Sequence, residues 1–151
     1  MGTLDHLVLR GMVFAGRHGA MAWEREVGQS FTVDVRLAMD LGPAGRSDSL
    51  HATVNYGEVF ARVRSRVEGP PVRLIETVAE GIAEDLLGAY PQVVSVEVRV
   101  KKPQAPVGGP MAYAAVEIVR TRSGGAEERP PAAQVEIDER PGPRSPGAEE
   151  L

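Results

Sequence analysis

The feature that most constrains the fold is a run of strict alternation from Gln29 to Leu41. From Phe31 onward every second residue is apolar, and the residues between them are mostly polar or charged. The apolar set is Phe31, Val33, Val35, Leu37 and Met39, and the polar set is Thr32, Asp34, Arg36 and Asp40. A period of two is typical of a strand with one buried face and one face in water. The run therefore predicts a half-buried antiparallel strand.

Three further strands are predicted at residues 5–14, 93–102 and 111–120, where strand-forming residues concentrate. In the last of these, Ala112, Ala114, Val116 and Ile118 share one face. Loops that connect the strands and helices are predicted at residues 15–28, 42–54 and 103–110.

Two helices are predicted in the middle of the chain. Asn55, with Glu58 three residues later, resembles a capping box, and Gly69-Pro70-Pro71 ends this first helix because proline cannot donate within it. Its predicted apolar face is Tyr56, Val59, Phe60, Val63 and Val67. The second helix contains Glu76 and stops near Gly88.

The order strand, strand, helix, helix, strand, strand predicts an α+β domain. Its expected form is a four-stranded antiparallel sheet with two helices on one face. Such a sheet has two edges, which are a liability unless they are covered or paired. Pairing the edges between subunits would close a larger barrel.

Charge and composition divide the chain of 151 residues in two. Of its 21 acidic and 17 basic side chains, seven and three lie in residues 123–151, so residues 1–122 carry 14 of each. Residues 1–122 are therefore neutral overall, and their sequence shows no basic patch of the kind that binds nucleic acid. Residues 123–151 hold five of the 12 prolines and little that could form a core, which predicts a disordered tail after one domain at residues 1–122.

The rest of the composition narrows the setting. There are no cysteines, so neither a disulfide framework nor a thiolate metal site is available. No apolar run approaches the length that spans a bilayer, and the N-terminal residues lack the pattern of a signal peptide. A cytoplasmic protein with no membrane contact is therefore expected.

Glu76 is the first candidate for a functional side chain. It lies in the first turn of its helix, beside an apolar stripe formed by Ile75, Val78, Ala79, Ile82 and Leu86. A carboxylate at this place faces the positive end of the helix dipole, which favours its ionised form. It is either a solvated first-turn glutamate or an anchor carboxylate at the mouth of a pocket.

Lys102 continues the phase of the valines on the buried face of its strand. It either extends to water or places its amine in a cleft, where partial desolvation suits an amine to proton transfer. Tyr56 is either a core aromatic or a catalytic phenol, and Glu24 is either solvated or part of a site. His6, His18 and His51 lack the spacing of a zinc site, so no metal is expected.

Taken in order, several motifs resemble the dihydroneopterin aldolases of folate synthesis, from about Leu4 to Arg122. They are Gly11-Met12-Val13-Phe14, Arg17-His18-Gly19-Ala20, Glu24-Arg25-Glu26-Val27-Gly28-Gln29, Asn55-Tyr56-Gly57-Glu58-Val59-Phe60, Leu74-Ile75-Glu76 and Lys102-Pro103-Gln104-Ala105-Pro106. Single motifs are unspecific, but their ordered sum is strong. Residues 123–151 have no counterpart in the family pattern.

The resemblance implies the tunnelling fold, in which four subunits join their sheets into a barrel and two rings stack into an octamer. It also implies active sites between subunits that bind a pterin and need no cofactor or metal. Glu76 would bind the pterin ring, with main-chain groups near Leu74, Ile75, Val54 and Ala20. Lys102, Tyr56 and Glu24 would carry the acid–base chemistry, with Tyr56 supplied across the interface.

Two other functions stay open at this point, and a third is disfavoured. A pterin side-chain epimerase of the same fold would use the same groups to break and remake the bond. A non-catalytic oligomer that binds pterins or purines would release no product. The zinc enzyme pyruvoyl-tetrahydropterin synthase, which shares the fold, is disfavoured by the missing histidine spacing.

Overall fold

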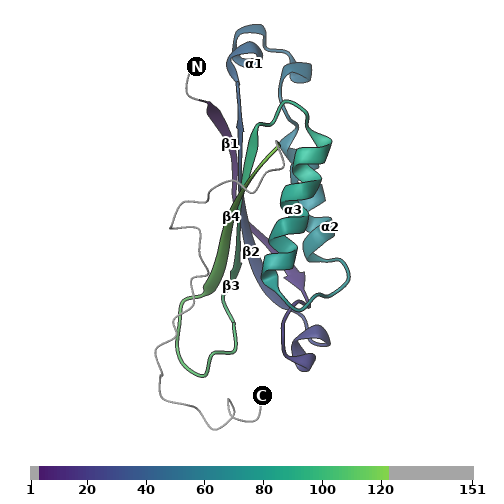
Figure 1. Ribbon diagram of the computed structural model, residues 1–151, viewed down its shortest axis with the longest axis vertical. Coiled ribbons are helices and arrows are strands. Elements are labelled where there is room, and N and C mark those ends of the chain that lie inside the picture. Colours follow the sequence, from purple (N-terminus) through teal and green to yellow (C-terminus); the bar gives the residue numbers. More distant parts are fainter. Residues whose placement is uncertain (1–3, 123–151) are drawn as a thin grey trace.

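The computed structural model describes residues 4–122, and the predicted tail at 123–151 lies outside the described residues. The order of strands and helices is that expected from the sequence. The strands are β1 (Asp5–Gly16), β2 (Gln29–Met39), β3 (Ser95–Lys102) and β4 (Ala114–Thr121), and the main helices are α2 (Tyr56–Val67) and α3 (Ile75–Ala89). Figure 1 shows α2 and α3 side by side on one face of the sheet, which gives a two-layer α+β domain.

The sheet is antiparallel throughout and has the order β1-β2-β3-β4. The alternation that predicted β2 is confirmed, because its five apolar residues from Phe31 to Met39 are each no more than 1% exposed. They form the centre of the core with the valines of β3 and the inner faces of both helices. Strands β1 and β4 are the two edges of the sheet.

Strand β1 contains a bulge that simple alternation does not predict. Leu9 pairs with Val35 and Met12 pairs with Val33, so Arg10 and Gly11 lie together opposite Asp34. Gly11 has a φ of 76°, a conformation that glycine adopts without steric cost. Its N–H donates to Asp34 Oδ1 at 2.6 Å.

Helix α2 begins as the sequence predicts, because the Asn55 side chain accepts from the N–H groups of Gly57 and Glu58. Its apolar face is narrower than predicted. Val59, Val63 and Val67 are fully buried, but Tyr56 is 66% exposed and Phe60 is 37% exposed. The prediction that Tyr56 and Phe60 belong to a buried face is therefore wrong, because both lie at the rim of the face that meets the sheet.

Two predicted connections contain short helical turns. Residues 15–28 include the 3₁₀ helix η1 (Ala22–Arg25), and residues 42–54 include α1 (Gly42–Ser47) and the 3₁₀ helix η2 (Leu50–Ala52). Pro43 lies at the start of α1, where its missing N–H costs nothing, and Asp48 ends the helix with a φ of 58°. Within residues 4–122, no helix combines the length and apolarity that a membrane span requires.

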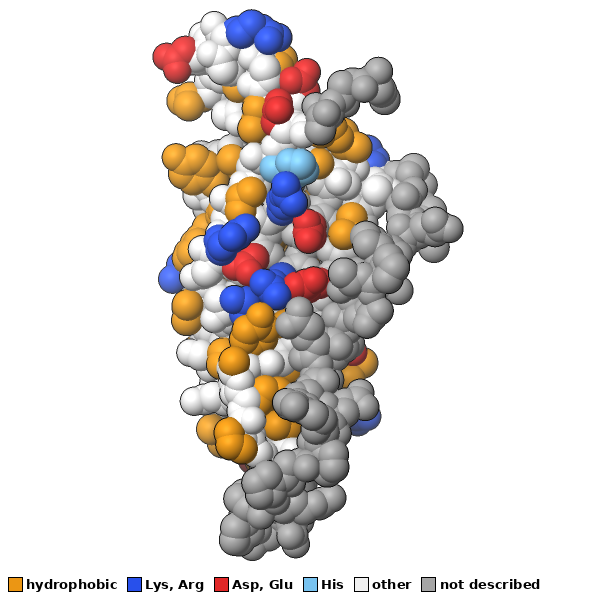
Figure 2. All heavy atoms as spheres, turned by 90° about the vertical axis from the view of Figure 1, so that its left-hand side faces the viewer, with side chains coloured by type: hydrophobic (Ala, Val, Ile, Leu, Met, Phe, Trp, Pro, Cys, Tyr) orange, Lys and Arg blue, Asp and Glu red, His pale blue; other side chains and the backbone are white. Residues whose placement is uncertain are grey.

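The face of the sheet opposite the helices carries charge. Figure 2 shows side chains of both signs gathered across the middle of this face. They line a shallow hollow of about 320 Å³, and the charged residues in it are Arg10, Asp34, Arg36, Glu97, Arg99, Lys101 and Glu117. Arg99 pairs with Glu117 at 2.7 Å, so much of this charge is neutralised across neighbouring strands.

Candidate active site

The centre of the candidate site is a buried ion pair between Lys102 and Glu24. The Nζ atom of Lys102 lies 2.6 Å from Glu24 Oε2, and the residues are 8% and 1% exposed. Lys102 occupies the buried phase at the end of β3, as the alternation predicts, so it does not extend to water. Glu24 lies in η1 and is buried by the turn around it, which excludes the solvated interpretation of this residue.

Glu24 is held by donors on both carboxylate oxygens. Met21 N–H donates to Oε1 at 3.2 Å, and the amide nitrogen of Gln29 donates to Oε2 at 3.1 Å. Gly19 packs so closely on this carboxyl group that a side chain at position 19 would collide with it. The carboxylate is thus fixed in place, as a buried charge must be to offset the cost of desolvation.

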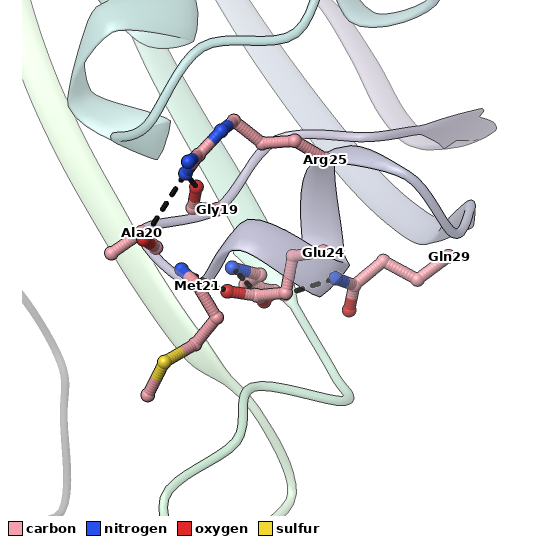
Figure 3. A network of polar contacts seen from close by, with 7 residues as sticks. Gly19, Ala20, Met21, Glu24, Arg25 and Gln29 are labelled. Atoms are coloured by element: carbon pink, nitrogen blue, oxygen red, sulfur yellow. Dashed lines mark hydrogen bonds and ion pairs between the residues drawn. The ribbon is translucent and has the colours of Figure 1, made fainter. Parts of the chain in front are cut away.

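The turn that carries Glu24 is itself braced by Arg25. Its guanidinium donates to the carbonyl oxygens of Gly19 at 2.8 Å and Ala20 at 3.1 Å, as the dashed lines in Figure 3 show. Ala20, a predicted pterin contact, is exposed and lies beside the buried pair. The six residues from Ala20 to Arg25 therefore present both a backbone surface and a buried carboxylate at one end of the sheet.

The start of α3 reaches the same end of the sheet. Gly19 N–H donates to the carbonyl of Val72 at 2.9 Å, which ties the turn before α3 to the turn that carries Glu24. Leu74 is the N-cap and is 50% exposed, whereas Ile75 is buried. Glu76 is half-buried in the first turn, and within residues 4–122 its carboxylate makes no hydrogen bond or ion pair. It is free to take a ligand.

Val54 and Tyr56 lie elsewhere in the chain. They flank the N-cap of α2, whose far end at Val67 approaches the site, and a helix of 12 residues is about 18 Å long. The start of α2 is fixed instead to the end of α3, because Tyr90 donates from its hydroxyl to Glu58 at 3.2 Å. One chain therefore brings together Glu24, Lys102, Ala20 and the segment Leu74–Glu76, but not Val54 or Tyr56.

Sequence reasoning missed two residues of this site. Gln29 shares the odd-numbered buried phase of β2, and a polar residue in that phase was a usable signal, as it was for Lys102. Its amide oxygen is buried and has no partner within residues 4–122. Because Glu24 can only accept, the amide nitrogen must face it, and the oxygen is left for another donor.

His18 is the second residue that was missed, having been considered only as a metal ligand. It is 1% exposed, and its ring contacts the edge of Phe31 with 5.5 Å between ring centroids. Burial lowers its pKa, and the positive charges of Lys102 and Arg17 act in the same direction, against a hydrogen bond to Val67 that favours the cation. Within residues 4–122, no three potential metal ligands of the His, Cys, Asp or Glu type converge.

A two-layer ββααββ domain with a buried lysine–carboxylate pair beside a helix N-terminus defines a small α+β protein with a candidate acid–base site. The dihydroneopterin aldolase (FolB) family model matches residues 7–119. The dihydroneopterin aldolase of Staphylococcus epidermidis is 46% identical over 116 residues, which are 77% of this chain and 96% of that protein. The dihydroneopterin aldolase of Bacillus subtilis is 41% identical over 120 residues, or 80% of this chain and all of that protein.

Solved structures agree with the sequence relatives. The crystal structure of E. coli dihydroneopterin aldolase in complex with neopterin superposes with a TM-score of 0.71 at 26% identity, covering 77% of this chain and 98% of that one. The chain belongs to the dihydroneopterin aldolase family, whose members are lyases of folate biosynthesis.

Proposed function

We propose that this chain cleaves 7,8-dihydroneopterin by a retro-aldol reaction into 6-hydroxymethyl-7,8-dihydropterin and glycolaldehyde. The observation that carries the proposal is the buried ion pair of Lys102 and Glu24, held at 2.6 Å at the end of the sheet that also carries Glu76. Buried ionisable groups that are paired and fixed are typical of acid–base sites. Membership of the family supplies the reaction class.

The substrate supplies its own electron sink. A base removes the proton of the side-chain hydroxyl next to the bond that breaks, and the electrons of that bond move into the ring imine, whose nitrogen takes up a proton. Glycolaldehyde leaves, and protonation of the enol carbon, with loss of the proton from the ring nitrogen, restores the imine and gives the hydroxymethyl product. The protein therefore has to position the substrate and move protons, with neither a Schiff base nor a metal.

Lys102, through a water molecule, is the main proton-transfer group in this proposal. Glu24 holds the amine of Lys102 and the substrate hydroxyls, and the partnerless amide oxygen of Gln29 is available to a further donor beside them. Tyr56 relays the hydroxyl proton and reprotonates the enol carbon. This division of roles agrees with the burial of Glu24 and Lys102 and with the exposed phenol of Tyr56, which is accessible to another subunit.

Glu76 binds the pterin ring. The ring N–H and the exocyclic amine form a fork of two donors, which a carboxylate matches with its two oxygens. The half-buried carboxylate of Glu76, without a partner in residues 4–122, suits this role. Main-chain groups near Leu74, Ile75 and Ala20 complete the contacts from the same chain, and those near Val54 come from a neighbour.

The complete site contains two copies of the chain. Because Val54 and Tyr56 lie at the opposite end of α2 from Val67, which approaches the site, a second subunit would supply them. Pairing of β1 with β4 of a neighbour would place the copies in this way, in a barrel of four subunits, with two rings in an octamer. Residues 1–122 form the catalytic domain, and residues 123–151 are a dispensable tail.

A product assay tests the proposal. The protein is incubated with 7,8-dihydroneopterin, and glycolaldehyde and the pterin products are measured. Release of glycolaldehyde with 6-hydroxymethyl-7,8-dihydropterin is the expected result. Formation of dihydromonapterin with the fragment retained would identify an epimerase instead, and binding without turnover would identify a non-catalytic pterin-binding oligomer.

A further inference from the structure

His18 lies between the two parts of the site that one chain provides. Its Nε2 atom is 2.7 Å from the carbonyl oxygen of Val67, and its Nδ1 atom is 3.1 Å from the backbone nitrogen of Val72. A backbone carbonyl can only accept and a backbone N–H can only donate. The two partners therefore fix the ring as the neutral tautomer with its proton on Nε2.

These bonds join elements that are far apart in the sequence. Val67 ends α2, and Val72 lies three residues before Ile75, the first residue of α3. The imidazole also packs edge-on against Phe31, whose ring lies 6.0 Å from the amine of Lys102. The ring of His18 thus packs against Phe31, which lies near the Lys102 amine, and also bonds to Val72 in the segment that leads to Glu76.

We propose that His18 is a positioning residue whose neutral ring holds the segment Val72–Glu76 in register with the Glu24–Lys102 pair, and whose protonation releases that segment. The proposal rests on the proposed function for its effect on pterin binding, but not for the structural effect. Protonation places a second N–H on Nδ1, which can no longer accept the bond from Val72. The release is local, since the bond from Gly19 N–H to the Val72 carbonyl at 2.9 Å remains.

The charges around the ring favour the neutral form. Lys102 on β3 and Arg17 beyond β1 lower its pKa together with burial, and the bond to Val67 only partly offsets them. Arg66 of α2 and Asp85 of α3 line the same hollow as His18 but pair with each other at 2.7 Å. The two hydrogen bonds of the neutral ring form a clamp. Because folding lowers the pKa of His18, the clamp is still intact at pH of about 6.5 and is lost only as the pH falls further, through the lowered pKa.

The test compares the full chain with His18→Phe and His18→Gln. Phenylalanine keeps the packing on Phe31 but makes neither hydrogen bond, and glutamine can still donate to Val67. The matched control is His51→Phe, which changes an exposed histidine in η2, next to α1. Three quantities are measured from pH 4.5 to 8: protection of the Val72 amide against exchange, the dissociation constant for neopterin, and the kinetics of glycolaldehyde release.

In the parent, the protection of the Val72 amide, corrected for the slower intrinsic exchange at low pH, and the neopterin affinity should both fall as the pH drops through the lowered pKa of His18. His18→Phe should exchange rapidly and bind about 10- to 100-fold more weakly at every pH, in KM more than in kcat. His18→Gln should recover part of the loss, and His51→Phe should match the parent. Parental exchange and affinity in a folded His18→Phe variant would overturn the proposal.

Two further results keep the test decisive. If His18→Phe does not fold, the nitrogen NMR signals of the parent decide, because a ring that is cationic at pH 7, or protonated on Nδ1 when neutral, contradicts the clamp. If the parent releases no glycolaldehyde while Val72 exchange and neopterin affinity follow the expected pH dependence, the proposed reaction fails and the positioning role of His18 stands.

Discussion

The two ends of helix α2 differ in how much of the proposed site a single chain provides. Near its C-terminal end, Lys102 and Glu24 are buried against each other, 8% and 1% exposed, and every polar atom of the Glu24 carboxylate has a donor. At its N-terminal end, Tyr56 is 66% exposed. The difference indicates that one chain buries the Lys102–Glu24 pair on its own and leaves Tyr56 outward, as the proposed site between two copies requires.

The largest expected effect is at the buried end. Lys102→Ala should lower kcat about 100- to 10,000-fold while neopterin affinity stays close to the parental value. It should also destabilise the fold by about 3–5 kcal/mol, because it leaves the Glu24 carboxylate buried without its cation. Steady-state kinetics, pterin titration and denaturant unfolding measure the three effects.

Lys101→Ala is the matched control for Lys102→Ala, since Lys101 is the preceding residue on the opposite face of β3. It should change neither turnover nor stability much. A double variant that carries Lys102→Ala and Glu24→Gln in the same chain should be more stable than Lys102→Ala alone, but it should not regain turnover. Parental turnover in Lys102→Ala would remove this lysine from the mechanism.

The next effect concerns pterin binding beside the buried pair. Glu76→Ala should weaken neopterin binding about 30- to several-thousand-fold. This corresponds to the cost of about 2–5 kcal/mol that is usual when one partner of a buried charged pair is truncated. Stability should fall by no more than about 1 kcal/mol, since a first-turn dipole contact is worth no more than that. Titration beside a thermal melt separates the two.

Glu84→Ala, an exposed glutamate on the same helix, controls for the loss of a charge from α3. It should bind neopterin like the parent. If Glu76→Ala also keeps the parental affinity and shows a modest shift in Tm, Glu76 is a solvated helix residue and the pterin is held elsewhere.

A mixing experiment tests the difference between the two ends directly. Tyr56→Phe and Lys102→Ala should each be poorly active alone. Unfolded together in equal amounts and reassembled, they should recover about a quarter of the parental sites, because a shared site can then draw both intact residues from different chains. The readout is glycolaldehyde release per site.

The control for mixing is an equal mixture of two single variants, Lys102→Ala and Glu24→Gln. The two altered positions lie at the same end of one chain. This pair should recover nothing, because no site can take its lysine and its glutamate from different subunits. Recovery equal to that of the first pair, or no recovery in either, would contradict the composite site.

The smallest expected effect is that of removing the tail. A chain shortened to end at Arg122 should keep its oligomeric state, its turnover and its neopterin affinity, because the residues that carry the site all lie before it. Size-exclusion chromatography with light scattering and the product assay measure this. An inactive monomer would make residues 123–151 part of the assembly.

Periodicity was enough to predict the sheet, the two helices and the place of Lys102 in the buried phase of its strand, because each depends on neighbours along one strand or helix. The same signal places Gln29 on the buried face. The burial of Glu24 could not be predicted in this way, since it depends on Gly19, Gln29 and Lys102 meeting from three segments. The outward position of Tyr56 was missed for a similar reason, because the width of the α2 face depends on the sheet beneath it.

The bulge in β1 has a consequence for insertions and deletions. Leu7 and Leu9 face the core before it, and Met12 and Phe14 face the core after it, so the inward positions change from odd to even at Arg10 and Gly11. Deleting Gly11 would leave one unbroken alternation with every inward side chain still inward. Replacing Gly11 with valine would keep the length of the chain but force a branched residue into a φ of 76°. We therefore expect deletion of Gly11 to destabilise the fold less than Gly11→Val.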